Sequence, residues 1–110
     1  GASFVARTTA FHVQEMQSMI KDALQHPGFS LIEVVSACPV IYGRLNKKGG
    51  APQMLKDFRD NSIPLAAVEK LPPEKVEGKI IRGILRKEIR PEFTAEYAAL
   101  CKRLQPERGE

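Results

Sequence analysis

The sequence predicts an α/β fold built around a partial parallel sheet, and three features support this. A short β-prone segment, residues 2–7, precedes an amphipathic stretch that is followed by the nearly continuous apolar run 29–37. A strand, a helix and a second strand in this order form a βαβ unit with parallel strands. A third β-prone stretch, residues 79–88, and a C-terminal amphipathic stretch complete the pattern. We therefore expect three strands and about three helices.

The totals favour one small globular domain spanning residues 1–110. Hydrophobic residues make up 43% of the chain and charged residues 27%, with a net charge of +4 and a pI near 9.3. The basic residues are interspersed with acidic ones and form no arginine-rich block, so nucleic-acid binding is disfavoured. No apolar run approaches the roughly 20 residues of a membrane span. Two cysteines do not form a secreted disulfide framework, and a cytoplasmic protein is expected.

The first half of the chain carries the βαβ unit. After the strand, the hydroxyl of Thr8 or Thr9 is suited to capping a helix over residues 11–25. Proline and glycine in residues 26–28 end this helix. The strand over residues 29–37 is apolar at almost every position, which is typical of a strand covered on both faces. One face of the helix is apolar, through Val13, Met16, Met19, Ile20, Ala23 and Leu24.

The second half is less regular. Residues 52–60 predict a short helix with proline in its first turn, and residues 63–78 are irregular around Pro72–Pro73. Gly83 within the third strand marks a bulge or a close backbone approach. Residues 91–104 predict an amphipathic helix, and residues 105–110 are expected to fray. The apolar stripe of that helix contains Phe93, Tyr97, Leu100, Cys101 and Leu104.

The two cysteines leave several interpretations open. Cys38 follows the second strand and precedes a proline, where it is either a small buried residue that ends the strand or a reactive thiol or metal ligand. Cys101 lies within an apolar stripe, which favours a packing role. A disulfide between them would require close approach of their Cα atoms and is disfavoured in the cytoplasm.

The loop after Cys38 carries the remaining candidates. Arg44, Lys47 and Lys48 form a basic cluster that is either a solvated loop or a contact for an acidic partner. Arg44 is the best of the three for a carboxylate or a phosphate, because its guanidinium donates in pairs. Tyr42 and Asn46 are expected to shape the loop through hydrogen bonds.

Other polar residues predict little chemistry. His12 and His26 are expected at the surface or in turns, because neither has metal-ligating neighbours at a suitable spacing. Glu15 and Asp22 are seven residues apart on one helix and predict a solvated face. We find no catalytic carboxylate pair.

Three stretches of the sequence, GASFVARTT, HPGFSLIEVV and above all CPVIYGRLN, resemble the C-terminal part of the β subunit of 2-oxoacid:ferredoxin oxidoreductases, in the 2-oxoglutarate branch. The later RGIL and RPEFTAEY add to this, whereas residues 51–78 match only loosely. The resemblance implies a coenzyme A-acylating oxidative decarboxylation that uses thiamine diphosphate, Mg²⁺ and a 4Fe-4S cluster, with ferredoxin as electron acceptor. It also implies an α subunit and further subunits as partners.

The resemblance assigns Cys38 to the fourth cysteine ligand of the iron–sulfur cluster. It implies that the following loop, with Tyr42, Gly43, Arg44 and Asn46, shapes either the cofactor pocket or a subunit contact. A four-iron cluster normally takes four cysteines, and this chain has two. The thiamine-binding stretch of the family is also absent. We therefore expect a fragment that binds none of these cofactors alone, is inactive alone and self-associates through an exposed strand edge. The alternative is a stand-alone interaction module that docks through residues 51–78 and the last helix.

Overall fold

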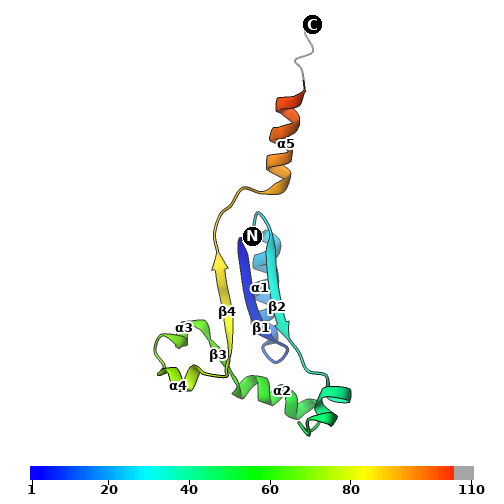
Figure 1. Ribbon diagram of the computed structural model, residues 1–110, viewed down its shortest axis with the longest axis vertical. Coiled ribbons are helices and arrows are strands. Elements are labelled where there is room, and N and C mark those ends of the chain that lie inside the picture. The colour runs from blue at the N-terminus through cyan, green and yellow to red at the C-terminus, as the bar shows by residue number, and fades with distance from the viewer. Residues whose placement is uncertain (106–110) are drawn as a thin grey trace.

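The fold is a four-stranded mixed sheet with one helix packed on it and a second helix projecting from its end. The computed structural model describes residues 1–105, with overall extents of 74 × 36 × 22 Å. The sheet order is β2-β1-β4-β3 (Figure 1). The strands are β1 (Phe4–Thr9), β2 (Ser30–Val35), β3 (Ser62–Pro64) and β4 (Ile80–Lys87). The longer helices are α1 (Val13–Gln25), α2 (Ala51–Asp60) and α5 (Phe93–Leu104). Three shorter helical turns are η1 (Pro39–Gly43), α3 (Leu65–Val68) and α4 (Pro73–Val76).

The predicted βαβ unit is confirmed. Strands β1 and β2 pair in parallel, with Phe4 opposite Ser30 and Thr9 opposite Val35, and α1 connects them. The core lies between α1 and the sheet, where Phe4, Ala6 and Met19 are buried. Ala23, Ile32 and Ile84 pack against this cluster. One helix thus ties three strands together through a small core.

The helix start differs from the prediction. Thr8 and Thr9 are the last two residues of β1, and α1 begins at Val13 with His12 at its cap position. Neither hydroxyl caps the helix, because both side chains are fully buried and bond to side chains of the next turn. The β-branched threonines extend the strand instead, in agreement with their strand preference.

The third predicted strand, β4, runs antiparallel to β1, with Ala6 opposite Ile84, so the sheet is mixed rather than wholly parallel. The short β3 pairs in parallel with β4 at the start of the stretch predicted to be irregular. The close approach expected at Gly83 is confirmed. Its φ of +141° suits glycine, and a Cβ there would lie 3.1 Å from the Leu65 Cβ at the β3–α3 corner.

Two surfaces that the sequence predicts to be buried are exposed within residues 1–105. Figure 1 shows α1 on one face of the sheet, while Leu31 of β2 is 51% exposed on the other, so burial on both faces is wrong for this part of the chain. The helix α5 forms as predicted but extends beyond the end of the sheet (Figure 1), and its apolar stripe faces solvent. No described helix is both long and apolar enough to cross a membrane. The fraying predicted for residues 106–110 lies outside the described residues.

Candidate functional site

Cys38 lies at the carboxyl end of β2, where the chain leaves the sheet. The strand ends at Val35, and Cys38 occupies the cap position of η1 with an extended backbone. Pro39 starts the turn, which suits a residue that lacks an N–H group and has a fixed φ. The side chain is exposed, and the thiol is free. The interpretation of Cys38 as a buried residue that ends the strand is therefore wrong.

The surroundings of this thiol favour its thiolate form. The backbone N–H of Tyr42, and then those of Ile41 and Val40, lower the pKa of Cys38, and the small degree of burial opposes them only in part. Amide groups at the start of a helical turn point their positive ends towards this position. The thiolate is both the nucleophile and the metal-binding form of cysteine. Cys38 is thus exposed, reduced and biased towards the chemically active form.

A cavity of about 550 Å³ adjoins Cys38 and separates the end of β2 from α2. Its lining is mostly apolar, with Lys48, Asp57 and Asn61 as polar members. Gly43 is buried where η1 packs on α2, and a Cβ at this position would lie 2.8 Å from the Met54 Sδ. Glycine therefore permits the close packing that sets one wall of the cavity. The remaining lining residues are Val35, Ser36, Ala37, Tyr42, Met54, Phe58 and Ile80.

Hydrogen bonds hold the loop after Cys38 in shape, as predicted for Tyr42 and Asn46. The Asn46 side-chain amide donates to the Tyr42 carbonyl over 2.8 Å, and the Asn46 backbone N–H donates to the same oxygen over 3.0 Å. The Lys48 N–H donates to the Gly43 carbonyl over 2.9 Å. Of the predicted basic cluster, Lys48 lines the cavity, while Arg44 is exposed. The loop is ordered by its own backbone.

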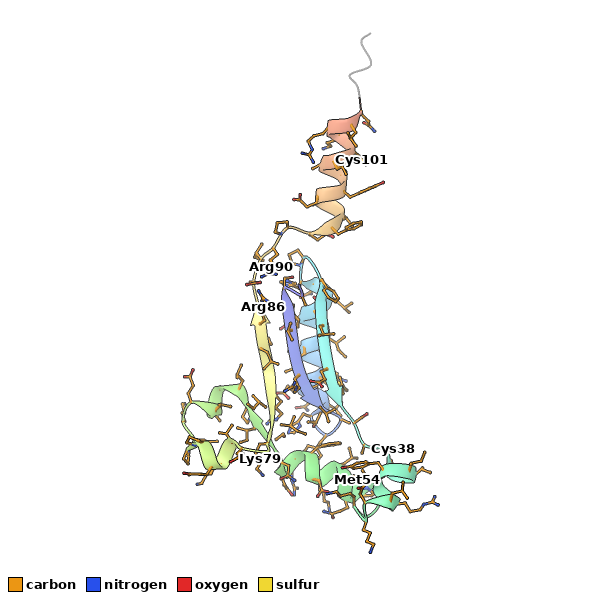
Figure 2. All side chains as sticks on the ribbon, in the orientation of Figure 1. Cys38, Met54, Lys79, Arg86, Arg90 and Cys101 are labelled. Atoms are coloured by element: carbon orange, nitrogen blue, oxygen red, sulfur yellow. The ribbon has the colours of Figure 1, made fainter. Side chains whose placement is uncertain are left out.

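The described residues assemble no complete metal-binding set at this site. Residues 1–105 contain no group of three or more His, Cys, Asp or Glu side chains placed to hold a metal ion. Cys101 lies on α5, at the opposite end of the molecule from Cys38 (Figure 2). Both thiols are free, so the disulfide alternative is wrong. Cys101 is only partly buried, and the packing role predicted for it is not fulfilled within the described residues.

A second polar cluster, which the sequence did not predict, lies where β1 meets α1. Glu15 accepts from the Thr8 hydroxyl over 2.8 Å and from the Arg82 guanidinium over 2.7 Å. Glu15 therefore does not lie on a solvated helix face as predicted. It joins α1 to both β1 and β4. A signal was present, because Arg82 interrupts an apolar strand and needs a partner if its neighbours are buried.

The two histidines also join elements rather than lie freely in turns. The Thr9 hydroxyl lies 2.8 Å from His12 Nδ1, and burial, followed by the positive charge of Arg82, lowers the pKa of His12. The Ser3 hydroxyl lies 2.8 Å from His26 Nε2, and the His26 ring lies 5.6 Å from the Phe4 ring. The two ends of α1 are thereby joined to β1 and to the residue that precedes it, and neither histidine has a metal-ligating partner set in residues 1–105.

Known proteins provide a direct comparison for this arrangement. The chain is 44% identical over 93 residues to the 2-oxoglutarate synthase subunit KorB of Methanothermobacter marburgensis, covering 84% of this chain and 33% of that protein. It is 38% identical over 107 residues to the KorB subunit of Methanocaldococcus jannaschii, covering 97% and 40%. It is also 33% identical over 84 residues to the 2-oxoacid:ferredoxin oxidoreductase subunit beta of a Sulfolobus species, covering 76% and 27%. No family model matches the chain.

The fold comparison agrees. A solved 2-oxoglutarate:ferredoxin oxidoreductase from Magnetococcus marinus, with 2-oxoglutarate, coenzyme A and succinyl-CoA bound, matches with a TM-score of 0.70 and 24% identity. That match covers 100% of this chain and 38% of the solved chain. The chain spans about a third of the length of the relatives that it matches. The chain is homologous to part of the β subunits of 2-oxoacid:ferredoxin oxidoreductases, and these relatives include 2-oxoglutarate synthase subunits.

Proposed function

We propose that this chain forms the C-terminal segment of the β subunit of a 2-oxoacid:ferredoxin oxidoreductase that acts on 2-oxoglutarate with coenzyme A. The relatives named 2-oxoglutarate synthase support the substrate, and the partial coverage supports a segment rather than a whole subunit. In this proposal Cys38 provides one thiolate ligand to a 4Fe-4S cluster. The complete reaction belongs to the assembled complex, and residues 1–110 alone are inactive.

The observation that carries the proposal is the state of Cys38. Its thiol is exposed and free, and the N–H groups of η1 lower its pKa. A thiolate ligand to iron must be a free thiol that can lose its proton, and hydrogen bonds to cluster sulfurs are one way in which a protein sets the cluster potential. A buried cysteine that only filled space would require none of them.

The residues described here fit one position of such a cluster. With no group of three ligands in residues 1–105, the other thiolates come from elsewhere in the proposed subunit. The bound cluster would supply one-electron transfer. The contribution of this chain is to hold the Cys38 thiolate at the carboxyl end of β2 and to fix the adjoining loop through Asn46 and Gly43.

The described residues do not fit thiamine diphosphate and its Mg²⁺ as an independent site, because they gather no carboxylate set for the metal. Of the loop residues assigned to the cofactor pocket, Asn46 is occupied by the Tyr42 carbonyl, and Gly43 is buried against Met54. Arg44 is exposed and is the residue available to a phosphate or a carboxylate. We assign Arg44 this role in the proposed pocket.

The proposed partners are the α subunit, further subunits of the complex and ferredoxin, in the cytoplasm. The homologues are subunits of multi-subunit oxidoreductases, which supports the first of these. Arg44, Lys47 and Lys48 form an exposed basic edge beside Cys38 that suits an acidic electron acceptor. Electron transfer to ferredoxin should then weaken as salt concentration rises.

The test is a Cys38→Ser substitution in the assembled oxidoreductase that contains this segment, with Cys101→Ser as the matched control. We expect Cys38→Ser to reduce iron content and to change the electron paramagnetic resonance signal of the cluster. Cys101→Ser should leave both unchanged, because Cys101 lies at the other end of the chain (Figure 2). Wild-type iron content and signals in the Cys38 variant would rule out the assignment.

A second candidate function, a non-catalytic interaction module, is favoured by one observation. The α5 helix projects from the sheet with its apolar stripe exposed (Figure 1), as expected of a docking element. A module of this kind would bind its partner equally well with Cys38 replaced by serine and without iron. Loss of assembly upon iron removal would favour the oxidoreductase segment.

A further inference from the structure

The helix α5 carries an apolar stripe on a surface that no described part of this chain covers. Its apolar residues follow a four-three-four spacing, Phe93, Tyr97, Leu100 and Leu104, which is the a/d pattern of a two-stranded coiled coil. These side chains are 78%, 58%, 40% and 72% exposed, respectively. The Phe93 and Tyr97 rings stack with their centroids 5.9 Å apart, so the stripe is continuous on one face.

The α5 helix is also capped by a side chain of its own segment. Its first turn is capped by the Glu92 carboxylate, which accepts from the Thr94 and Ala95 N–H groups. In the preceding linker, Glu88 forms exposed ion pairs with both Arg86 and Arg90. Figure 1 shows the axis of α5 leading away from the sheet, at the end opposite α2. The helix therefore presents its stripe clear of the sheet.

Charged residues beside the apolar stripe of α5 indicate which partner this helix binds. In the heptad set by the apolar residues, Glu96 and Arg103 both take g positions on the same flank of the helix. They lie seven residues apart, about 10.5 Å along the axis, so they do not pair within one helix. In an antiparallel pair of identical helices the g flanks face each other. Glu96 of each copy then meets Arg103 of the other, twice by two-fold symmetry.

We propose that α5 pairs with the α5 helix of a second copy of this chain in an antiparallel, two-fold symmetric arrangement. In the apolar seam, Phe93 packs opposite Leu104 of the other copy, and Tyr97 opposite Leu100. A parallel pair would instead place Glu96 opposite Cys101, with no charge partner. The charge pattern thus selects both the occupant and its direction.

The exposed area of the apolar stripe determines the affinity expected for the dimer. Aromatic side chains carry roughly 150–250 Å² each, so at these exposures the stripe offers about 400–500 Å² per helix. This is the size of a functional patch on a monomer. Two copies together bury about 900 Å², below the roughly 1,200 Å² of standard stable interfaces. We therefore expect a transient dimer with a dissociation constant above about 1 μM.

Charge reversal in the full chain tests the pairing by analytical ultracentrifugation, at protein concentrations up to about 1 mM. Arg103→Glu or Glu96→Arg alone places like charges opposite each other at both symmetric sites and should weaken dimerisation about five- to tenfold. The double variant restores both pairs and should recover the wild-type constant to within about twofold. Lys102→Glu is the matched control, because it makes the same charge change on the outer face of α5.

A crosslink tests the direction independently. In the antiparallel pair Thr94 of one copy faces Cys101 of the other, since both are e positions. Thr94→Cys in a Cys38→Ser background should therefore form a disulfide-linked dimer on mild oxidation. Within one helix the two positions are about 10.5 Å apart along the axis, beyond disulfide reach. Ala95→Cys, on the outer face, is the control and should not crosslink in the same way.

The outcomes separate the alternatives. Dimerisation that single reversals weaken, the double variant restores and the Thr94→Cys crosslink traps supports the pairing. A monomer at every concentration overturns it. A dimer that is insensitive to both charge reversal and Leu100→Asp also overturns it, and places self-association at another surface, such as the β2 edge. Far-UV circular dichroism shows that each variant retains its helices.

Discussion

The ion pair between Glu15 and Arg82 should couple α1 to β4 more strongly than a surface pair of the same chemistry. The joined atoms lie 2.7 Å apart, and the side chains are 18% exposed for Arg82 and 28% for Glu15. At an effective dielectric constant of about 20, two charges about 4 Å apart attract by about 4 kcal/mol. Residual solvent and the loss of side-chain freedom offset much of this, which leaves an expected coupling free energy of about 1–2 kcal/mol.

A double-mutant cycle measures this coupling. Glu15→Gln, Arg82→Gln and the combination are compared by urea unfolding, followed by far-UV circular dichroism because the chain has no tryptophan. The matched control is the Arg7–Glu33 pair, which joins β1 to β2 with side chains 39% and 55% exposed. We expect a coupling of at most about 0.5 kcal/mol there. Equal couplings in the two cycles, within about 0.3 kcal/mol, would refute the argument from burial.

Two further predictions concern the site. Gly43→Ala should lower the free energy of unfolding by about 1 kcal/mol, because the added methyl group meets the Met54 sulfur at 2.8 Å. In urea unfolding, the destabilisation caused by Gly43→Ala should be smaller when Met54 is also replaced by alanine. An equal destabilisation in both backgrounds would contradict the proposed contact. A second prediction concerns the alkylation rate of Cys38, measured against pH in a Cys101→Ser chain. The increase in rate with pH should begin at a lower pH for the folded chain than for the chain unfolded in urea, because the η1 amides lower the Cys38 pKa. A thiol with a lowered folded-state pKa stabilises the fold above its ordinary titration range and loses that effect as pH falls through the folded pKa. Coincident rate profiles for the folded and unfolded chains would contradict this.

Local patterns in the sequence predicted the helices and strands that pack against neighbouring segments of this chain. The βαβ unit was predictable because its apolar periodicity changes from strand to helix and back, and its core closes on Phe4 and Met19. The α2 helix was predictable from its proline start. The location of the candidate site came from the family resemblance over CPVIYGRLN, because the residues alone fitted Cys38 equally to a small buried position at the strand end. The exposure and pKa shift of Cys38 depend on η1, which the sequence did not predict.

The predictions that failed concern pairing over long sequence distances. Nothing in the local sequence indicates that β4 enters the sheet antiparallel to β1. Arg82 within an apolar strand indicates that a partner is needed, but not that the partner is Glu15, 67 positions away. Thr8 was placed at a helix cap because the local rule for capping is short-range, whereas its hydroxyl bonds to Glu15 once α1 folds back on the sheet. Tertiary contacts override local preference at these positions.

The proposed self-association is assigned to α5 rather than to the β2 edge because of where the charges lie. The open face next to the β2 edge carries Arg7 paired with Glu33, so covering it would remove that ion pair from water. A charged side chain in the middle of an edge strand is also a common protection against edge pairing. The α5 stripe contains no charge between Phe93 and Leu104, and its charges stand on the flank, where they select a partner. The exposed strand edge is therefore the more protected of the two surfaces, and the projecting helix is the one arranged to be covered.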